Sequence, residues 1–299
     1  MTDTAIQSHP YISVITINFN DRIGLERTIR SVISQTYSGF EYIIIDGGSR
    51  DGSKDIIEKY KNHFSYWVSE PDNGIYHAMN KGVKQAKGEY CLFLNSGDFL
   101  CNPNTLNIAA QELKVVGADI CTGTLLCKKE NYISGVIFPP KNVTLMLFKG
   151  GLEHQATFTK RVWLEKIPFA EDTKIVGDWQ QFITCISING ASYAPIKCPI
   201  SIYDTSGVST LESNYKKIHT ERKKFQSQFV SPWLLEEIKT ILSSDIHLFT
   251  IDKNNHSILF ALIKYIKKLQ TQPAKYWYKI KYNKKLKESL QTSKASKEN

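Results

Sequence analysis

The chain has 299 residues, of which 41% are apolar, 11% aromatic and 22% charged, a composition typical of globular enzymes that excludes disordered, fibrous and disulfide-scaffold proteins. Its formal net charge is +9, but the twelve lysines and two glutamates after residue 252 carry a net +10, which leaves residues 1–252 at −1. The body of the chain is therefore nearly neutral, and the basic excess belongs to the C-terminal tail.

Short apolar runs alternate with helical patterns through the first 105 residues. The predicted strands are Tyr11–Ile17, Glu41–Asp46, Phe64–Val68 and Tyr90–Leu94. The predicted helices between them have their apolar residues at Leu25, Ile29, Val32 and Ile33, at Ile56, Ile57 and Tyr60, and within Ile75–Ala86. This alternation of strands and helices predicts an α/β protein with a mainly parallel sheet.

Polar clusters follow three of these strands, where ligands of parallel sheets bind. The clusters are Asn18, Phe19, Asn20 and Asp21, then Asp46, Gly47, Gly48, Ser49 and Asp51, and finally Asn95, Ser96, Gly97 and Asp98. Each cluster alone is equally consistent with turn chemistry. Three clusters at neighbouring strand ends favour one shared crevice. Within it, Asp98 is either a turn cap or a ligand for a hard divalent cation.

After residue 105 the alternation of strands and helices becomes less regular. Short strands are predicted at Ile120–Leu126, Ile133–Phe138, Thr157–Thr159 and Ser192–Ala194, around a helix at Asp178–Ile188 and before a helical segment at 211–250. The six cysteines show no metal-ligand spacing, which favours reduced core thiols over a zinc module. We find neither a secretory signal nor an apolar run of about 20 residues, so we expect a cytoplasmic protein.

Three motifs in order carry a family resemblance: ISVITINFN, QTYSGFEYIIIDGGSRDGS and SEPDNGIYHAMNKGVKQAKGEYCLFLNSGD. Together they resemble family 2 glycosyltransferases with the GT-A fold, in particular the subgroup that builds bacterial capsule, O-antigen and colanic-acid type polysaccharides. Weaker matches follow at GLEHQATF and VGDWQQF. The resemblance implies a catalytic domain at 1–210, with a Rossmann-like donor half at about 11–105 and a mixed acceptor half at about 120–206. C-terminal helices at 211–252 and a basic aromatic tail at 253–299 follow.

The resemblance also implies the residues of the donor site. The first two motifs cradle the nucleoside in this family, which implies donor contacts from Phe19, Asn20, Asp46, Gly47 and Asp51. The family's DxD-type motif matches the fourth strand end, which implies donor contacts from Asn95, Ser96, Gly97 and Asp98, with Asp98 as the ligand of Mn²⁺ or Mg²⁺.

Three departures from the family pattern concern the donor. Many relatives have a second acidic residue where this chain has Gly47, and further Asp residues where it has Asn95 and Gly97. Many also have a diphosphate-binding Arg at the position of Met79, for which Lys81 or Lys84 is a candidate replacement. Because Gly47, Asn95 and Gly97 replace acidic residues, the predicted donor site carries less negative charge than the donor sites of the relatives.

The family's catalytic base matches Asp178, which would deprotonate an acceptor hydroxyl in a single inverting displacement. Read alone, an Asp at the start of a helix is also a common N-cap. His154 and Gln155 match a family pair beside the acceptor and diphosphate region, and Trp179 is placed either to stack on an acceptor sugar or to pack in the core.

The C-terminal tail has two basic segments. Residues 257–270 place Lys264, Lys267 and Lys268 on one helical face, which suits either packing on the domain or a membrane interface. The stretch AKYWYKIKYNKKLK interleaves aromatics with lysines, a pattern that suits anionic lipid headgroups, nucleic acid or a solvated terminus. Because transferases of this type act on lipid-linked acceptors, we expect a peripheral protein at the inner face of the plasma membrane that binds no nucleic acid.

These observations predict an inverting glycosyltransferase that moves a sugar from a nucleotide-diphosphate donor to a glycan or polyprenyl-linked acceptor. A nucleotidyltransferase needs a glycine-rich basic loop after the first strand, and NFNDRIG is a poor candidate for one. The alternative from a different class is a non-catalytic membrane- or nucleic-acid-binding protein on a degenerate GT-A scaffold.

Overall fold

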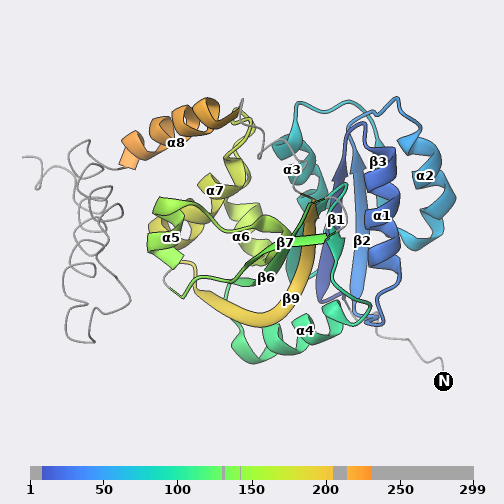
Figure 1. The fold of residues 1–299 in the computed structure, drawn as a ribbon, viewed down its shortest axis with the longest axis horizontal. Helices are drawn as coiled ribbons and strands as arrows, with labels where there is room; N and C mark the ends of the chain where they lie inside the picture. Colours follow the sequence, from blue (N-terminus) through green and yellow to red (C-terminus); the bar gives the residue numbers. More distant parts are fainter. Residues whose placement is uncertain (1–8, 130–131, 142, 205–213, 230–299) are drawn as a thin grey trace, which may run out of the picture. The chain divides into compact units, whose positions relative to one another are not determined.

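The computed structural model describes residues 9–129, 132–141, 143–204 and 214–229. Its strands are β1 (Ile12–Asn18), β2 (Phe40–Asp46), β3 (Tyr66–Ser69), β4 (Tyr90–Asn95), β5 (Phe99–Leu100), β6 (Ile120–Lys129), β7 (Tyr132–Ile137), β8 (Thr157–Lys160) and β9 (Tyr193–Asp204). Its helices are α1 (Arg22–Ile33), α2 (Ser53–Tyr60), α3 (Ile75–Gln85), α4 (Thr105–Val116), α5 (Val143–Lys149), α6 (Arg161–Lys166), α7 (Gly177–Phe182) and α8 (Tyr215–Phe229) (Figure 1). A π-helical segment, Ile183–Ile188, continues α7.

The described strands form one sheet in the order β3-β2-β1-β4-β8-β6-β9-β5, with β7 paired to β6. The first four strands in this order are mutually parallel. Asn18 of β1 pairs with Asp46 of β2, and Ile17 pairs with Asn95 of β4, so the three strand ends lie side by side. The chain order reverses between β1 and β4, which places the expected ligand crevice there. The α/β fold prediction is confirmed.

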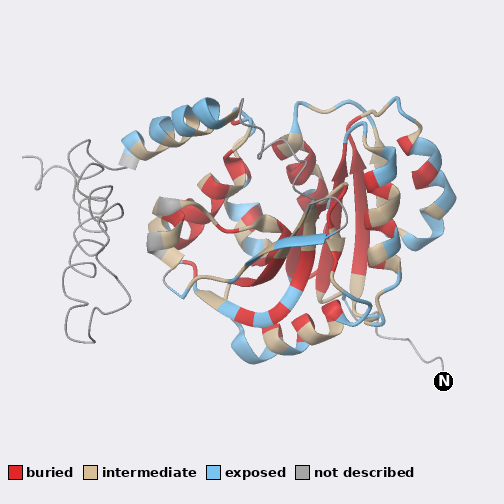
Figure 2. Ribbon diagram, viewed as in Figure 1, coloured by how far each residue is buried: buried red, intermediate tan, exposed pale blue. Residues whose placement is uncertain are grey.

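The parallel strands are buried on both faces because their residues alternate between two cores (Figure 2). Ile12 and Val14 pack with residues of α1, α2 and α4, whereas Ile15 and Ile17 pack with residues of α3 and α6. A Cβ at Gly82 of α3 would lie 2.5 Å from Cγ2 of Ile15, so the close approach of α3 to β1 requires glycine there.

The second half of the sheet is mixed, as predicted. Strand β8 runs antiparallel to β4 and β6, and β9 runs parallel to β6. The prediction that a strand covers only Ser192–Ala194 is wrong, because β9 continues for twelve residues to Asp204. Pro195 and Pro199 interrupt its strand pattern in the sequence, and the structure accommodates them beside two register shifts in the β6 ladder.

The structure describes only part of the C-terminal region for which we made predictions. The chain divides into two compact units, Met1–Phe225 and Gln226–Asn299, and most of the second unit lies outside the described residues. The predicted helical segment at 211–250 is represented by α8, whereas the tail at 253–299 lies wholly outside. Among the helices that are described, none is both long and apolar enough to cross a bilayer.

Candidate active site

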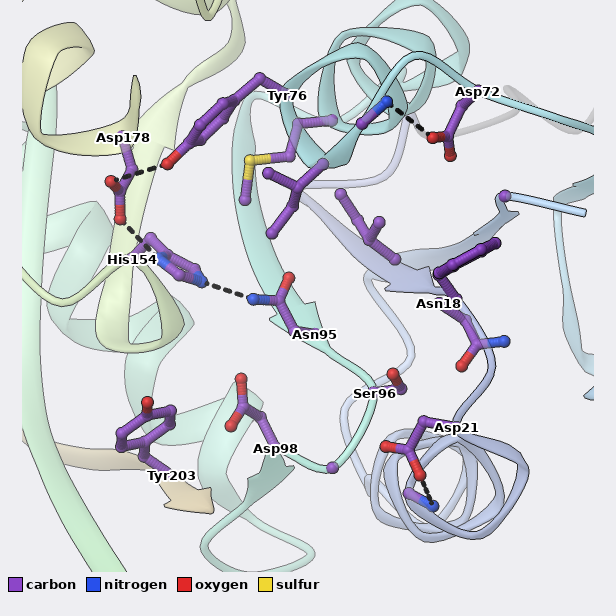
Figure 3. Close-up of a pocket in the computed structure, with 18 of the residues that line it drawn as sticks. Asn18, Asp21, Asp72, Tyr76, Asn95, Ser96, Asp98, His154, Asp178 and Tyr203 are labelled. Atoms are coloured by element: carbon purple, nitrogen blue, oxygen red, sulfur yellow. Dashed lines mark hydrogen bonds and ion pairs between the residues drawn. The ribbon is translucent and has the colours of Figure 1, made fainter. Parts of the chain in front are cut away.

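A cavity of about 900 Å³ opens at the carboxyl ends of β1 and β4, where the strand order reverses (Figure 3). The sequence-predicted residues that line it are Phe19, Gly47, Asn95, Ser96, Gly97, Asp98, His154 and Asp178. Those that do not line it are Asn20, Asp46, Asp51, Gln155 and Trp179. The structure therefore brings both candidate catalytic carboxylates, Asp98 and Asp178, to one cavity.

The carboxylate of Asp46 joins the chain segments at the ends of β1, β2 and β3, which form the donor side of the cavity. Its carboxylate is fully buried and accepts hydrogen bonds from Asn18 Nδ2 at 2.6 Å, from Ser49 N at 3.0 Å, and from the Ser49 and Ser69 hydroxyls at 2.6 Å each. These donors follow or end three different strands. Asp46 was expected to contact the donor, but the structure places it behind the cavity wall, where it positions the loops.

Asn20 and Asp51 link the loop after β1 to the loop after β2. Asn20 Oδ1 accepts from Arg50 N at 2.8 Å, and its backbone has a φ of 51°, which Asn tolerates better than most residues. Asp51 Oδ2 accepts from Arg22 N at 2.7 Å, and Oδ1 accepts from Ser53 N at 3.0 Å. Both residues thus hold the turn together instead of facing the cavity.

The Asn95–Asp98 loop is tied to α1 by its backbone. Thr28 Oγ1 accepts from Gly97 N at 3.0 Å and donates to Asp98 O at 2.6 Å, while Arg27 Nη2 donates to Gly97 O at 2.8 Å. Gly97 has a φ of 98°, a conformation that favours glycine. The Asp98 side chain lines the cavity although the residue is only 3% exposed.

Asp178 is joined to the Asn95 side of the cavity through His154. Asp178 Oδ2 lies 2.8 Å from His154 Nδ1, and Asn95 Nδ2 lies 3.1 Å from His154 Nε2 (Figure 3). The other Asp178 oxygen accepts from Trp179 N at 2.8 Å and from the Tyr76 hydroxyl at 3.3 Å. These contacts fix the carboxylate of Asp178 at the cavity wall.

The same contacts set the protonation states of the pair. Burial by itself raises the pKa of Asp178, but the hydrogen bond and charge of His154 outweigh it and hold that pKa below its ordinary value. Burial opposes protonation of His154, but the hydrogen bond and charge of Asp178, and then the charge of Asp98, raise its pKa. Asp178 is therefore ionised at neutral pH, as a proton acceptor must be.

The oxygen atoms near Asp98 suit a hard divalent cation. Asn95 Oδ1 is buried and accepts no hydrogen bond from the part of the chain that is described, and the Asp98 carboxylate lines the same cavity. The described residues contain no group of three His, Cys, Asp or Glu side chains able to hold a metal. A cation bound here would need ligand oxygens from a diphosphate and water, the arrangement that Mg²⁺ favours.

Trp179 belongs to the core of the acceptor half and does not face the cavity. Its side chain is 3% exposed, its Nε1 donates to Leu147 O at 2.6 Å, and its ring lies 5.5 Å from that of Phe225 in an edge-on contact. Of the two alternatives for Trp179, stacking on an acceptor sugar or packing in the core, the structure supports core packing. Gln155 is likewise buried and does not line the cavity.

The sequence did not identify several residues that line the cavity, namely Arg27, Asp72, Tyr76, Lys174 and Tyr203. Lys81, expected to compensate for Met79, pairs with Glu70 at 2.7 Å, and neither it nor Lys84 lines the cavity. The Arg and Lys residues that do line it are Arg27 and Lys174, which lie 52 positions before and 95 positions after Met79. Asp21, which the sequence placed in the polar cluster after the first strand, does line the cavity and is the N-cap of α1, where it accepts from Gly24 N at 2.9 Å.

Comparison with known proteins decides the family. Residues 13–159 match the model of glycosyl transferase family 2. An uncharacterized glycosyltransferase of Mycobacterium tuberculosis is 33% identical over 220 residues, which cover 68% of this chain and 78% of that protein. The chain is a member of glycosyltransferase family 2.

Other relatives of this family 2 enzyme are named for particular biosynthetic products. A PGL/p-HBAD biosynthesis glycosyltransferase of Mycobacterium bovis is 31% identical over 183 residues, covering 60% of this chain and 70% of that protein. A Bacillus subtilis protein named for teichuronic acid biosynthesis is 38% identical over 94 residues, covering 30% of this chain and 36% of that protein.

Solved structures confirm the fold of the enzyme. Residues 1–349 of Staphylococcus aureus TarS, solved with UDP-GlcNAc, match with a TM-score of 0.57 at 20% identity over 79% of this chain and 67% of that one. The full TarS chain is longer, and the match spans 36% of it. The mannosyltransferase PcManGT of Pyrobaculum calidifontis, solved with GDP-Man and Mn²⁺, matches with a TM-score of 0.51 at 19% identity over 72% of this chain and 61% of that one.

Proposed function

We propose that this family 2 enzyme transfers a sugar from a nucleoside-diphosphate donor to a hydroxyl of a glycan or lipid-linked acceptor in surface polysaccharide synthesis, with inversion at the anomeric carbon. The observation that carries the proposal is one cavity with Asp98 on its donor side and Asp178 on its acceptor side. The relatives named for PGL/p-HBAD and teichuronic acid biosynthesis support the acceptor class. The nucleotide sugars bound to two structural neighbours support the donor class.

Asp178 is the proposed general base. As the acceptor oxygen bonds to the anomeric carbon, its proton passes to the Asp178 carboxylate, and the bond from that carbon to the diphosphate oxygen breaks. The lowered pKa of Asp178 keeps the carboxylate ionised for this step, and His154 and Tyr76 hold its two oxygens in place. His154 is thus a positioning residue.

Asn95 Oδ1 and the Asp98 carboxylate are the proposed protein ligands of Mn²⁺ or Mg²⁺. Such a cation supplies positive charge that stabilises the departing diphosphate. Thr28 and Arg27 support this part of the site, because they fix the backbone of the loop that carries both ligands.

We further propose that the enzyme works in the cytoplasm, at the inner face of the plasma membrane, through its basic tail at 253–299. The tail has a net charge of +10, and each lysine near an anionic surface contributes about 1 kcal/mol. Deletion of residues 257–299 is expected to release the protein from anionic liposomes in a flotation assay. Equal flotation of both proteins would reject the proposal.

A donor screen tests the proposed function. Binding and turnover of UDP-, GDP- and dTDP-sugars are measured with Mn²⁺, and the anomeric configuration of the product is read by NMR. We expect one donor class to bind in a Mn²⁺-dependent manner and the product to have the opposite anomeric configuration. Retention would reject the inverting mechanism, and absence of binding by every donor would favour a non-catalytic protein on this scaffold.

A further inference from the structure

Three residues from three different loops meet at one corner of the cavity. Phe19 follows β1, Gly47 follows β2, and Asp72 lies between β3 and α3, and all three line the cavity. A Cβ added at Gly47 would lie 2.7 Å from Asp72 Oδ2 and 3.2 Å from Cδ2 of Phe19. The carboxylate of Asp72 and the ring of Phe19 therefore border the space that a side chain at position 47 would occupy.

We propose that Asp72 determines which nucleobase the donor carries and that it selects bases with a ring N–H on their pairing edge. Uracil, thymine and guanine present such a group, whereas cytosine presents a ring nitrogen that accepts hydrogen bonds. An ionised carboxylate only accepts hydrogen bonds, so it favours the first set and disfavours cytosine. This inference rests on the proposed function, because it assigns a contact within the same donor site.

Phe19 completes the proposed base site. Its side chain is 66% exposed although it lines the cavity, so its ring is accessible to a ligand. Aromatic rings bind bases by stacking, which contributes about 1–3 kcal/mol per base and discriminates little among bases. Stacking on Phe19 thus accounts for affinity, and the hydrogen bond to Asp72 accounts for selection. Glycine at position 47 leaves room between them.

A structural role accounts for the position of only one of the two carboxylate oxygens of Asp72. Oδ1 accepts from Gly74 N at 2.9 Å, a bond within the turn that precedes α3 (Figure 3). Oδ2 is the oxygen that faces position 47. Asparagine can accept the same bond from Gly74 N through its amide oxygen, but its other group is an NH₂ donor. The substitution Asp72→Asn therefore keeps the bond to Gly74 N and reverses the hydrogen-bonding character that a base would meet.

The test measures binding of UDP, GDP and CDP with Mn²⁺ by calorimetry. We expect wild-type enzyme to bind UDP or GDP at least tenfold more tightly than CDP, since a hydrogen bond to a charged group contributes about 1.5–3 kcal/mol. In Asp72→Asn we expect this preference to fall about tenfold or more, with CDP gaining affinity. Asp172→Asn, an exposed carboxylate outside the cavity, is the control and should keep the wild-type ratio. An unchanged ratio in Asp72→Asn would overturn the inference.

A second pair of variants relocates the carboxylate. Asp72→Ala should lose the preference over CDP, and adding Gly47→Asp to it should restore most of that preference, because the new side chain enters the space that Asp72 has left. Failure of the double variant to restore any preference, with binding of all three diphosphates intact, would also overturn the inference. If wild-type enzyme binds none of the three, the proposed function itself fails, and this inference fails with it.

Discussion

The two sides of the cavity are held together in different ways. On the donor side, loops that follow neighbouring parallel strands are joined by buried or turn-forming carboxylates, with Asp46 and Asp51 accepting from residues of adjacent loops. On the acceptor side, Asp178 is positioned by Tyr76 and His154, which lie 102 and 24 positions away in sequence. The geometry of the donor side follows from the order of the strands in the sheet, whereas the geometry of the acceptor side depends on packing between segments that are distant in sequence.

Helix α8 contributes to this packing. Both oxygens of Glu221 accept backbone N–H bonds from the segment before α7, at 3.1 to 3.3 Å from the nitrogens of Lys174, Ile175 and Val176. Arg222 lies over the Trp179 ring at 5.1 Å. The element that carries the proposed base is thus fixed by a helix that begins more than 30 residues later in the chain.

Trp179→Ala should give the largest change in stability, because it removes a core ring of the acceptor side. We expect the free energy of unfolding to fall by about 3–5 kcal/mol in chemical denaturation. Trp67→Ala, at a partly buried ring on donor-side strand β3, should cost less. An equal loss in the two variants would remove the contrast between the two sides.

Asp46→Asn should loosen the donor side. Asparagine has one acceptor oxygen and one NH₂ donor, so at least one of the four donors around Asp46 would lose its partner. We expect a loss of about 1–3 kcal/mol in the free energy of unfolding, together with weaker binding of UDP and GDP. Unchanged unfolding and unchanged nucleotide binding would show that Asp46 does not hold these loops.

Glu221→Gln should affect the acceptor side alone. Replacing a carboxylate that accepts three backbone bonds with a neutral amide is expected to cost about 1 kcal/mol and to lower kcat severalfold. Donor binding, measured by calorimetry, should stay unchanged. Glu165→Gln, which removes a partly exposed ion pair with Arg161, is the matched control. Weakened donor binding with normal kcat would contradict the division between the two sides.

Glu26→Gln should have the smallest effect, on the contact of α1 with α2. Hydrogen bonds from Arg30, Lys59 and Tyr60 lower the pKa of Glu26 to about 2. Because the pKa is lower in the folded state, this contact stabilises the protein above about pH 5 and is lost as the pH falls toward 2. The melting temperatures of wild type and Glu26→Gln should therefore differ most at pH 7 and converge as the pH is lowered to about 2. A difference that is the same at both values would contradict the assignment.

The donor side was largely predictable from the sequence. Apolar strands followed by polar clusters place Asn18, Asp46 and Asn95 at adjacent strand ends, and the register confirms this. The direction in which each side chain points was not predictable. Hydrogen bonds from other loops hold Asp46 behind the cavity wall, whereas Asp72 lines the cavity and its Oδ1 is bonded within its own loop, to Gly74 N.

The acceptor side was predictable only through the family resemblance. No local sequence pattern predicts that His154 and Asp178 are in contact. The residues around Trp179 likewise show no periodicity that would predict its burial. The burial of Trp179 depends on contacts with Leu147 and Phe225, which no local pattern links to α7. The length of β9 was missed for a related reason, since its prolines are tolerated only in the paired context of β6.

The most direct test of the account is Asp178→Asn, measured for transfer and for donor binding in the same preparation. A general base contributes about 10²–10⁴-fold to the rate, so we expect kcat to fall by that factor while the Kd of the donor changes by less than about twofold. This result would place Asp178 on the acceptor side of the reaction. Transfer at the wild-type rate, or loss of donor binding equal to the loss of transfer, would contradict the central claim.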